Sequence, residues 1–187
     1  MDKQLLLDLT KADLSEELKS MNQPAFRGKQ ILEGLYQHHY QSFSEFTNLP
    51  NTLKAELDAK FLVDPIKSHT SITSQDKRTS KYLFEVLEGN RIETVLMKYS
   101  DRNTVCISSQ VGCPLGCVFC ATGQMGFTRS LSAGEIIAQV LFFMRTLEAR
   151  DENLTNIVYM GMGEPFLNYA SVMRSIEILT DPELLNF

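Results

Sequence analysis

The sequence has 187 residues, a formal net charge of −5 and a hydrophobic content of 43%. This composition is typical of a folded globular protein, and the negative charge does not favour the basic surface that usually binds nucleic acid. No apolar run approaches membrane-spanning length. Acidic and basic residues near the N-terminus break up the apolar core that a signal peptide would need. With unpaired thiols, these features indicate a cytoplasmic protein without membrane association.

Residues 1–60 have the pattern of a small helical domain. Thr10 and Asp13 can form a capping box, and apolar residues follow them at helical spacing. A second helix is expected to start near Pro24, and a third to follow the break at 48–51. The apolar stripes of these helices would form the core of an N-terminal accessory domain.

The pattern changes to strands in residues 61–103. Apolar and polar residues alternate over 82–86, and a second apolar strand is expected at 92–99. A turn signal at 88–90 separates them, as in a hairpin. This segment is therefore predicted to be an antiparallel connector between the helical domain and the rest of the chain.

Residues 104–187 alternate strand and helix. A strand at 104–108 is followed by a helix that starts at a Ser132 capping box, then by a strand at 156–160 and a helix at 169–180. Such β-α-β-α units build parallel sheets and barrels. Two units cannot close a barrel, so an α/β fold is expected, with the truncated start of a barrel from a longer protein or a shortened relative of one.

Cys113, Cys117 and Cys120 have C-x3-C-x2-C spacing. Three thiolates can hold three irons of a [4Fe–4S] cluster and leave the fourth iron open to another ligand. Zinc is an alternative, with Cys106 as a fourth thiolate, although structural zinc usually takes two close pairs of ligands. Redox-active or idle thiols are a further alternative, and the spacing favours the cluster.

A second motif, Gly161-Met162-Gly163-Glu164-Pro165, follows the predicted strand at 156–160. Ligands of α/β folds lie beyond the carboxyl ends of strands, so this motif and the cysteines are expected on one face. Glycines allow the backbone to approach a ligand closely, and Glu164 can accept hydrogen bonds from an ammonium group. Alone the motif is compatible with a simple turn, but beside the cysteines it indicates a cofactor site.

Together these motifs resemble the radical S-adenosylmethionine (SAM) superfamily. More narrowly, the sequence resembles the RNA adenine C2-methyltransferases that act on 23S ribosomal RNA and on tRNA. The narrower resemblance extends along the whole chain, through residues 24–31, 46–50, 91–95, 105–113 and 161–168.

The resemblance implies a radical SAM (βα)6 barrel that binds a [4Fe–4S] cluster and SAM. By motif position, the residues that match the three cluster ligands are Cys113, Cys117 and Cys120. Gly163 and Glu164 match the contact with the SAM amino group. In the family, a first SAM methylates a cysteine in the C-terminal region, and a radical from a second SAM then joins that methyl carbon to adenine.

The same resemblance implies two catalytic residues in this chain. Glu93 matches the glutamate that removes the adenine C2 proton, and Cys106 matches the thiol that resolves the protein–RNA adduct through a transient disulfide bond. The implied partners are 23S rRNA, tRNA and an electron donor such as flavodoxin, for an enzyme that is monomeric when full length.

The cysteine that carries the methyl group has no counterpart before Phe187. We therefore expect this chain by itself not to methylate RNA. Two alternatives stay open. One is the sister type of enzyme, which methylates C8 of the same rRNA adenine and confers antibiotic resistance. The other is a non-catalytic iron–sulfur or RNA-binding fragment.

Overall fold

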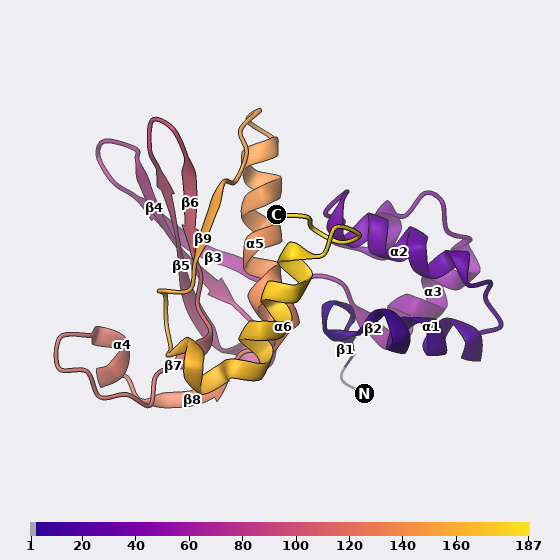
Figure 1. Ribbon diagram of the computed structural model, residues 1–187, viewed down its shortest axis with the longest axis horizontal. Coiled ribbons are helices and arrows are strands. Elements are labelled where there is room, and N and C mark those ends of the chain that lie inside the picture. Colours follow the sequence, from indigo (N-terminus) through magenta and orange to yellow (C-terminus); the bar gives the residue numbers. More distant parts are fainter. Residues whose placement is uncertain (1–2) are drawn as a thin grey trace. The chain divides into compact units, whose positions relative to one another are not determined.

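The protein is described by a computed structural model that covers residues 3–187 (Figure 1). The chain folds as two compact units. One contains the residues up to Pro65 together with Glu177–Phe187, and the other contains Ile66–Ile176. The predicted division at 60/61 and 103/104 stays a prediction.

The first unit is built mainly from three helices, α1 (Lys11–Ser20), α2 (Phe26–Tyr36) and α3 (Asn51–Lys60). The predicted capping box starts α1. A short η1 helix (Leu6–Asp8) precedes α1, an η2 turn (Phe43–Glu45) precedes α3, and β1 (Gln4–Leu5) pairs in parallel with β2 (Phe61–Leu62). The core is apolar and comes from all three helices and the turns between them: Leu14, Leu18, Ile31, Leu35, Phe43, Phe46, Leu53 and Leu57.

The second unit is organised around a five-stranded sheet with the order β3-β4-β5-β6-β9. The strands are β3 (Lys67–Thr73), β4 (Thr79–Glu85), β5 (Arg91–Lys98), β6 (Asn103–Cys106) and β9 (Asn156–Val158). Neighbours from β3 to β6 pair antiparallel, and β9 pairs parallel to β6. The turn η3 (Leu87–Gly89) joins β4 to β5. The predicted strands of the connector therefore share one sheet with the first strand after it.

Helix α5 (Ala133–Glu148) connects β6 to β9 and lies alongside the sheet (Figure 1). Its predicted capping box is present, since the Ser132 hydroxyl accepts from Glu135 N–H and the Glu135 carboxylate accepts from Ser132 N–H. Tyr82 and Phe84 of β4 pack edge-to-face against Phe142 and Phe143, with ring centroids 4.7–6.1 Å apart. This aromatic packing fixes α5 on one face of the sheet.

The remaining elements lie around the ends of β6 and β9. β7 (Gln110–Gly112) and β8 (Phe127–Ser130) form a two-stranded ribbon, and the loop between them contains the short helix α4 (Ala121–Gln124). Further on, η4 (Pro165–Asn168) precedes α6 (Tyr169–Thr180). The described residues thus form a mixed α/β structure with N-terminal helices and a mainly antiparallel sheet, and they do not show the predicted barrel units. Among the described helices, none has both the length and the apolar character to cross a bilayer.

Candidate functional site

The segment that leads into the cysteines lies beside the glycine motif, just beyond the carboxyl ends of β6 and β9. The backbone N–H groups of Ser109 and Gln110 both donate to the Met162 carbonyl, at 2.9 and 3.1 Å. In return, Gly161 N–H donates to the Ile107 carbonyl at 3.0 Å. The segment that leads into the cysteines is therefore joined to the glycine motif by backbone hydrogen bonds.

The two glycines of the motif are required by this close contact. A Cβ at Gly161 would lie 2.7 Å from the Ile107 carbonyl oxygen. Gly163 has a φ of +98°, and a Cβ there would lie 2.8 Å from Gln110 N. Both positions therefore need glycine for packing between the two segments, whatever else the motif binds.

Glu164 is held at both its backbone and its side chain. Its N–H donates to Gln110 Oε1 at 3.0 Å, and its Oε1 accepts from Phe166 N–H at 3.1 Å as the cap of η4. One carboxylate oxygen is thus used to orient the side chain at the start of this turn.

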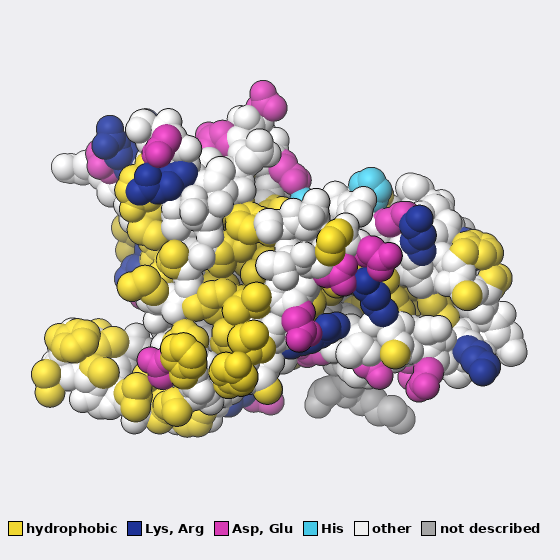
Figure 2. Space-filling view, viewed as in Figure 1, with side chains coloured by type: hydrophobic (Ala, Val, Ile, Leu, Met, Phe, Trp, Pro, Cys, Tyr) yellow, Lys and Arg dark blue, Asp and Glu magenta, His cyan; other side chains and the backbone are white. Residues whose placement is uncertain are grey.

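The cysteine loop has a buried base and an exposed tip. At the base, Gln110, Val111 and Gly112 are buried. Cys113 N–H donates to the Gly126 carbonyl at 2.9 Å. At the tip, Val118 and Phe119 are 89% and 90% exposed, and hydrophobic side chains gather over the α4 segment at the lower left of Figure 2.

The cysteine thiols differ in their surroundings. Backbone N–H groups of Gly123 and then Thr122 lower the pKa of Cys120, since they stabilise its thiolate. Burial raises the pKa of Cys106, against a smaller opposing hydrogen bond from the Met160 backbone. All four cysteines are free thiols, so the structure does not support a disulfide bond.

Cys113, Cys117 and Cys120 are brought to one loop, but their side chains are not gathered into a metal site. Within residues 3–187, no group of three His, Cys, Asp or Glu side chains is close enough to hold a metal ion. Three free thiols on one surface loop are nevertheless the donor type that iron–sulfur clusters take. The donor chemistry of the loop therefore fits a cluster.

Glu93 and Cys106 lie on the same face of the sheet. Val95 of β5 is the pairing partner of Cys106, and Glu93 is two residues before Val95, so the three side chains point the same way. Thr94, which lies between Glu93 and Val95 in β5, points to the opposite face, and its hydroxyl donates to Gln139 Oε1 of α5 at 2.8 Å. Glu93 and Cys106 therefore lie on the face opposite α5, and Lys81 Nζ is 2.8 Å from the Glu93 carboxylate.

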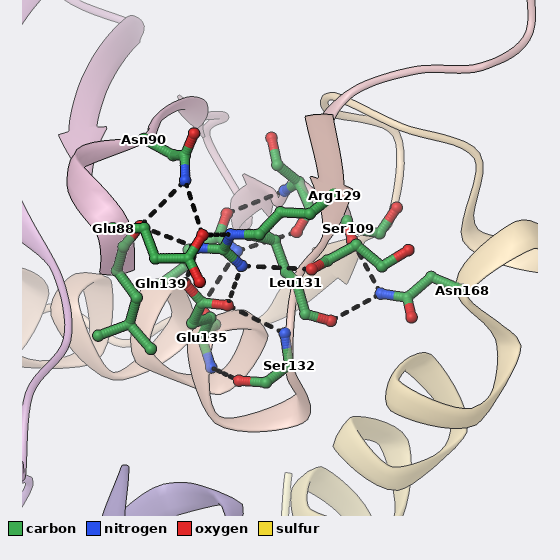
Figure 3. Close-up of polar contacts among 12 residues, drawn as sticks. Glu88, Asn90, Ser109, Arg129, Leu131, Ser132, Glu135, Gln139 and Asn168 are labelled. Carbon is green, nitrogen blue, oxygen red and sulfur yellow. Dashed lines mark hydrogen bonds and ion pairs between the residues drawn. The ribbon is translucent and has the colours of Figure 1, made fainter. Parts of the chain in front are cut away.

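Arg129 joins the base of the cysteine loop to α5, a role that the sequence did not reveal (Figure 3). Its guanidinium makes two parallel hydrogen bonds to the Glu135 carboxylate, at 2.7 and 2.8 Å, and a third to the Leu87 carbonyl at 2.9 Å. Glu88 adds an ion pair at 3.2 Å. The Glu135 side chain is only 1% exposed, and these bonds raise the pKa of Arg129. The contact thus compensates a buried carboxylate.

Asn168 joins the glycine-motif side to the same region (Figure 3). Its amide donates to the Ser109 carbonyl at 2.9 Å and to the Leu131 carbonyl at 2.8 Å. These bonds connect the end of η4 to the segments on both sides of the β7–β8 ribbon. The loop base, the α5 start and the glycine motif are therefore one hydrogen-bonded assembly.

Comparison with known proteins places this chain in a family. Residues 5–63 match the family model described as "Ribosomal RNA large subunit methyltransferase N-terminal domain". The chain is 44% identical, over 183 residues, to the "Probable dual-specificity RNA methyltransferase RlmN" of Pelodictyon phaeoclathratiforme. That alignment covers 95% of this chain and 51% of the relative. The chain belongs to the RlmN family.

The alignments with two further proteins cover similar shares of this chain and of the other protein. The "Dual-specificity RNA methyltransferase RlmN" of Sulfurovum sp. is 41% identical, with 97% of this chain and 53% of that protein aligned. A radical SAM methyltransferase from Sphaerobacter thermophilus has a crystal structure that superimposes with a TM-score of 0.93 at 46% identity, covering 98% of this chain and 54% of that one. The chain thus spans about half the length of these three proteins, and it corresponds to their N-terminal part.

Proposed function

We propose that this chain is the N-terminal part of a radical SAM methyltransferase that methylates C2 of an adenine in 23S rRNA and in tRNA. The observation that carries the proposal is the backbone hydrogen bonding between the segment that leads into the cysteines and the glycine motif, beyond β6 and β9, in a chain of the RlmN family. Its partners would be the two RNAs and an electron donor such as flavodoxin, in the cytoplasm, with the complete protein a monomer.

The proposal extends to the fold. The β6-α5-β9-α6 segment would form the first two βα units of a (βα)6 barrel, because β6 and β9 are parallel and α5 connects them. The domains would be a helical domain at 1–60, a connector at 61–103 and the start of the barrel at 104–187. β9 is an edge strand of the described sheet, and a following barrel strand would pair with it.

Cys113, Cys117 and Cys120 would hold a [4Fe–4S] cluster at the loop tip. The support is their free, surface-accessible thiols and the backbone N–H groups that favour the Cys120 thiolate. Gly163 and Glu164 would hold the amino group of SAM, since Glu164 is anchored where the two segments meet. When bound, the cluster and SAM would supply the radical chemistry that an unactivated adenine carbon needs.

Glu93 and Cys106 would act on the RNA from the face of the sheet opposite α5. Glu93 would accept the adenine C2 proton, and Lys81 places a positive charge next to its carboxylate. Cys106 would resolve the protein–RNA adduct. Because burial raises the pKa of its thiol, Cys106 would stay protonated near neutral pH until a base or a conformational change activates it.

Anaerobic reconstitution tests the cluster in this chain. We expect about four iron atoms per chain, with most of the iron lost when Cys113, Cys117 or Cys120 is changed to Ala. Cys106→Ala is the matched control, because it removes a thiol outside the loop and should retain the iron. Stoichiometric zinc binding by all four cysteines would contradict the cluster assignment.

Nucleoside analysis tests the reaction. The protein to use is this chain joined to the C-terminal part of the Sphaerobacter thermophilus methyltransferase, below called the completed protein. With SAM, a reductant and unmodified 23S rRNA or tRNA, mass spectrometry should show 2-methyladenosine, and the 187-residue chain by itself should give none. Formation of 8-methyladenosine would instead assign the sister activity, and absence of both would leave an iron–sulfur or RNA-binding fragment.

A further inference from the structure

The pairing of β5 with β6 ends at Val95, two residues before Glu93 is reached. The ladder runs from the Lys98–Asn103 pair to the Val95–Cys106 pair, and its continuation would place Glu93 opposite Ser108. The chain instead turns into β7 at Gln110. Backbone N–H and C=O groups that lose a ladder partner inside a protein need another hydrogen-bond partner, and this applies to the N–H and C=O groups of Glu93.

Two side chains take over the missing ladder bonds. The Ser108 hydroxyl donates to the Glu93 carbonyl at 2.5 Å and accepts from Met162 N–H at 2.9 Å. The Met162 sulfur lies 3.2 Å from Glu93 N and accepts its hydrogen. Both backbone groups of Glu93 are therefore held by side chains. Ser108 belongs to the segment that leads into the cysteines, and Met162 is the central residue of the glycine motif.

Gln139 holds Ser108 in turn. Its Oε1 accepts from Ser108 N–H and its Nε2 donates to the Ser108 carbonyl, both at 2.9 Å. Both Ser108 and Gln139 are fully buried. The amide of Gln139 thus replaces a strand neighbour for Ser108, and it fixes the hydroxyl where it meets Glu93 and Met162.

We propose that Ser108 and Met162 are positioning residues for Glu93. They set the place of this carboxylate relative to the glycine motif, so that the residue that accepts the proton and the turn that contacts the cofactor move as one body. The proposal rests on the proposed function for the role of Glu93, but the coupling itself is a property of the described residues.

Hydrogen exchange of the 187-residue chain tests the coupling. In Ser108→Ala, Met162 N–H loses its acceptor, and we expect the amides of Met162 and Glu93 to exchange about tenfold faster, as for the loss of one buried hydrogen bond. Ser109→Ala is the matched control. Ser109 is also buried, and its hydroxyl has no hydrogen-bond partner among the described residues.

The exchange rates in Ser109→Ala show whether the faster exchange in Ser108→Ala comes from the lost hydrogen bonds. Ser109→Ala should leave both amides within about twofold of their original rates. Equal acceleration in the two variants, or none in Ser108→Ala, would overturn the coupling. Met162→Leu provides a second variant of similar size that removes only the sulfur acceptor. It should accelerate Glu93 N–H exchange and leave the exchange of Met162 N–H nearly unchanged.

Kinetics of the completed protein test the positioning role. Ser108→Ala should lower kcat about tenfold or more while the KM for RNA and the iron content stay within about twofold, since no RNA or cluster contact is removed. If Ser108 acts through Glu93, adding Ser108→Ala to Glu93→Gln should cause little further loss. An equal loss in both backgrounds would refute the positioning role and leave the proposed function intact. A completed protein that is folded and carries about four iron atoms, yet is inactive, would refute the proposed function, and hydrogen exchange would still decide the coupling.

Discussion

The base and the tip of the cysteine loop differ in almost every physical respect. The base is a paired ribbon with buried backbone, a glycine at φ +74° and the Arg129–Glu135 contact behind it. The tip has exposed Val118 and Phe119, and within residues 3–187 its thiols are not part of a group that could hold a single metal ion. The base therefore fixes where the cysteines are presented, and the tip is held by fewer buried contacts.

This contrast explains how a loop can be both specific and adaptable. Exposed apolar side chains at the tip gain little from their present contacts, so a change in conformation costs little there. The base cannot move without separating buried charged and polar groups.

Loss of the Glu135 carboxylate should have the largest effect. Glu135→Ala leaves the half-buried Arg129 guanidinium without its bidentate partner and removes the α5 capping box. We expect the free energy of unfolding to fall by about 3 kcal/mol in urea denaturation. Glu152→Ala is the control, because its pair with Lys98 is more exposed and should contribute less than about 1 kcal/mol. Similar losses in the two variants would remove the special role of the base.

A side chain at Gly112 should be the next most damaging change. Its positive φ disfavours L-residues, and a Cβ there would lie 2.0 Å from the Gly126 carbonyl oxygen. Gly112→Ala should cost at least about 2 kcal/mol in the same denaturation measurement. Gly116→Ala at the tip has open space around its Cβ and should be close to neutral. A tolerated Gly112→Ala would show that the ribbon is not rigid.

The thiols should differ in reactivity as the pKa shifts indicate. Without metal near neutral pH, iodoacetamide should modify Cys120 at least about tenfold faster than Cys106, because the thiolate is the reacting form. Raising the pH should accelerate Cys106 more steeply, since its raised pKa leaves it protonated where Cys120 already titrates. Mass spectrometry of peptides at several pH values measures both rates. A Cys106 that reacts as fast as Cys120 would contradict its burial.

Substitutions at the tip should have the smallest effect on stability. Val118→Ser and Phe119→Ser each remove an apolar side chain that is almost fully exposed. The free energy of unfolding should change by no more than about 0.5 kcal/mol. A loss above about 1 kcal/mol would mean that the tip packs against other residues in solution.

Local signals predicted part of this fold well. Both capping boxes, at Thr10 and Ser132, were predicted because their contacts join residues three apart in sequence. Strand β3 was missed, since all of its residues are exposed and show no apolar alternation. The strand predicted at 104–108 ends at Cys106, because Gln139 takes the backbone groups of Ser108. That bond joins residues far apart in sequence, which no local pattern contains.

The site was predictable where spacing carries the chemistry. The cysteines and the glycine motif were found from their spacing, and the structure brings their segments together. Arg129, Ser108 and Met162 were not found, since each acts through partners on other elements. Gln139 did leave a signal, because a polar residue interrupts the apolar stripe of its helix. The cluster role of the three loop cysteines, the SAM contact of Gly163 and Glu164, and the catalytic roles of Glu93 and Cys106 all stay predictions.

The contacts around Glu93 also bear on how easily its position can change in evolution. A ladder hydrogen bond is made by the main chain and survives nearly every substitution. At Glu93 the corresponding bonds come from the side chains of Ser108 and Met162, with Gln139 behind them. Point mutations in three codons can therefore shift this carboxylate without altering the sheet. The position of this carboxylate therefore depends on side chains, at a point where main-chain bonds would be insensitive to most substitutions.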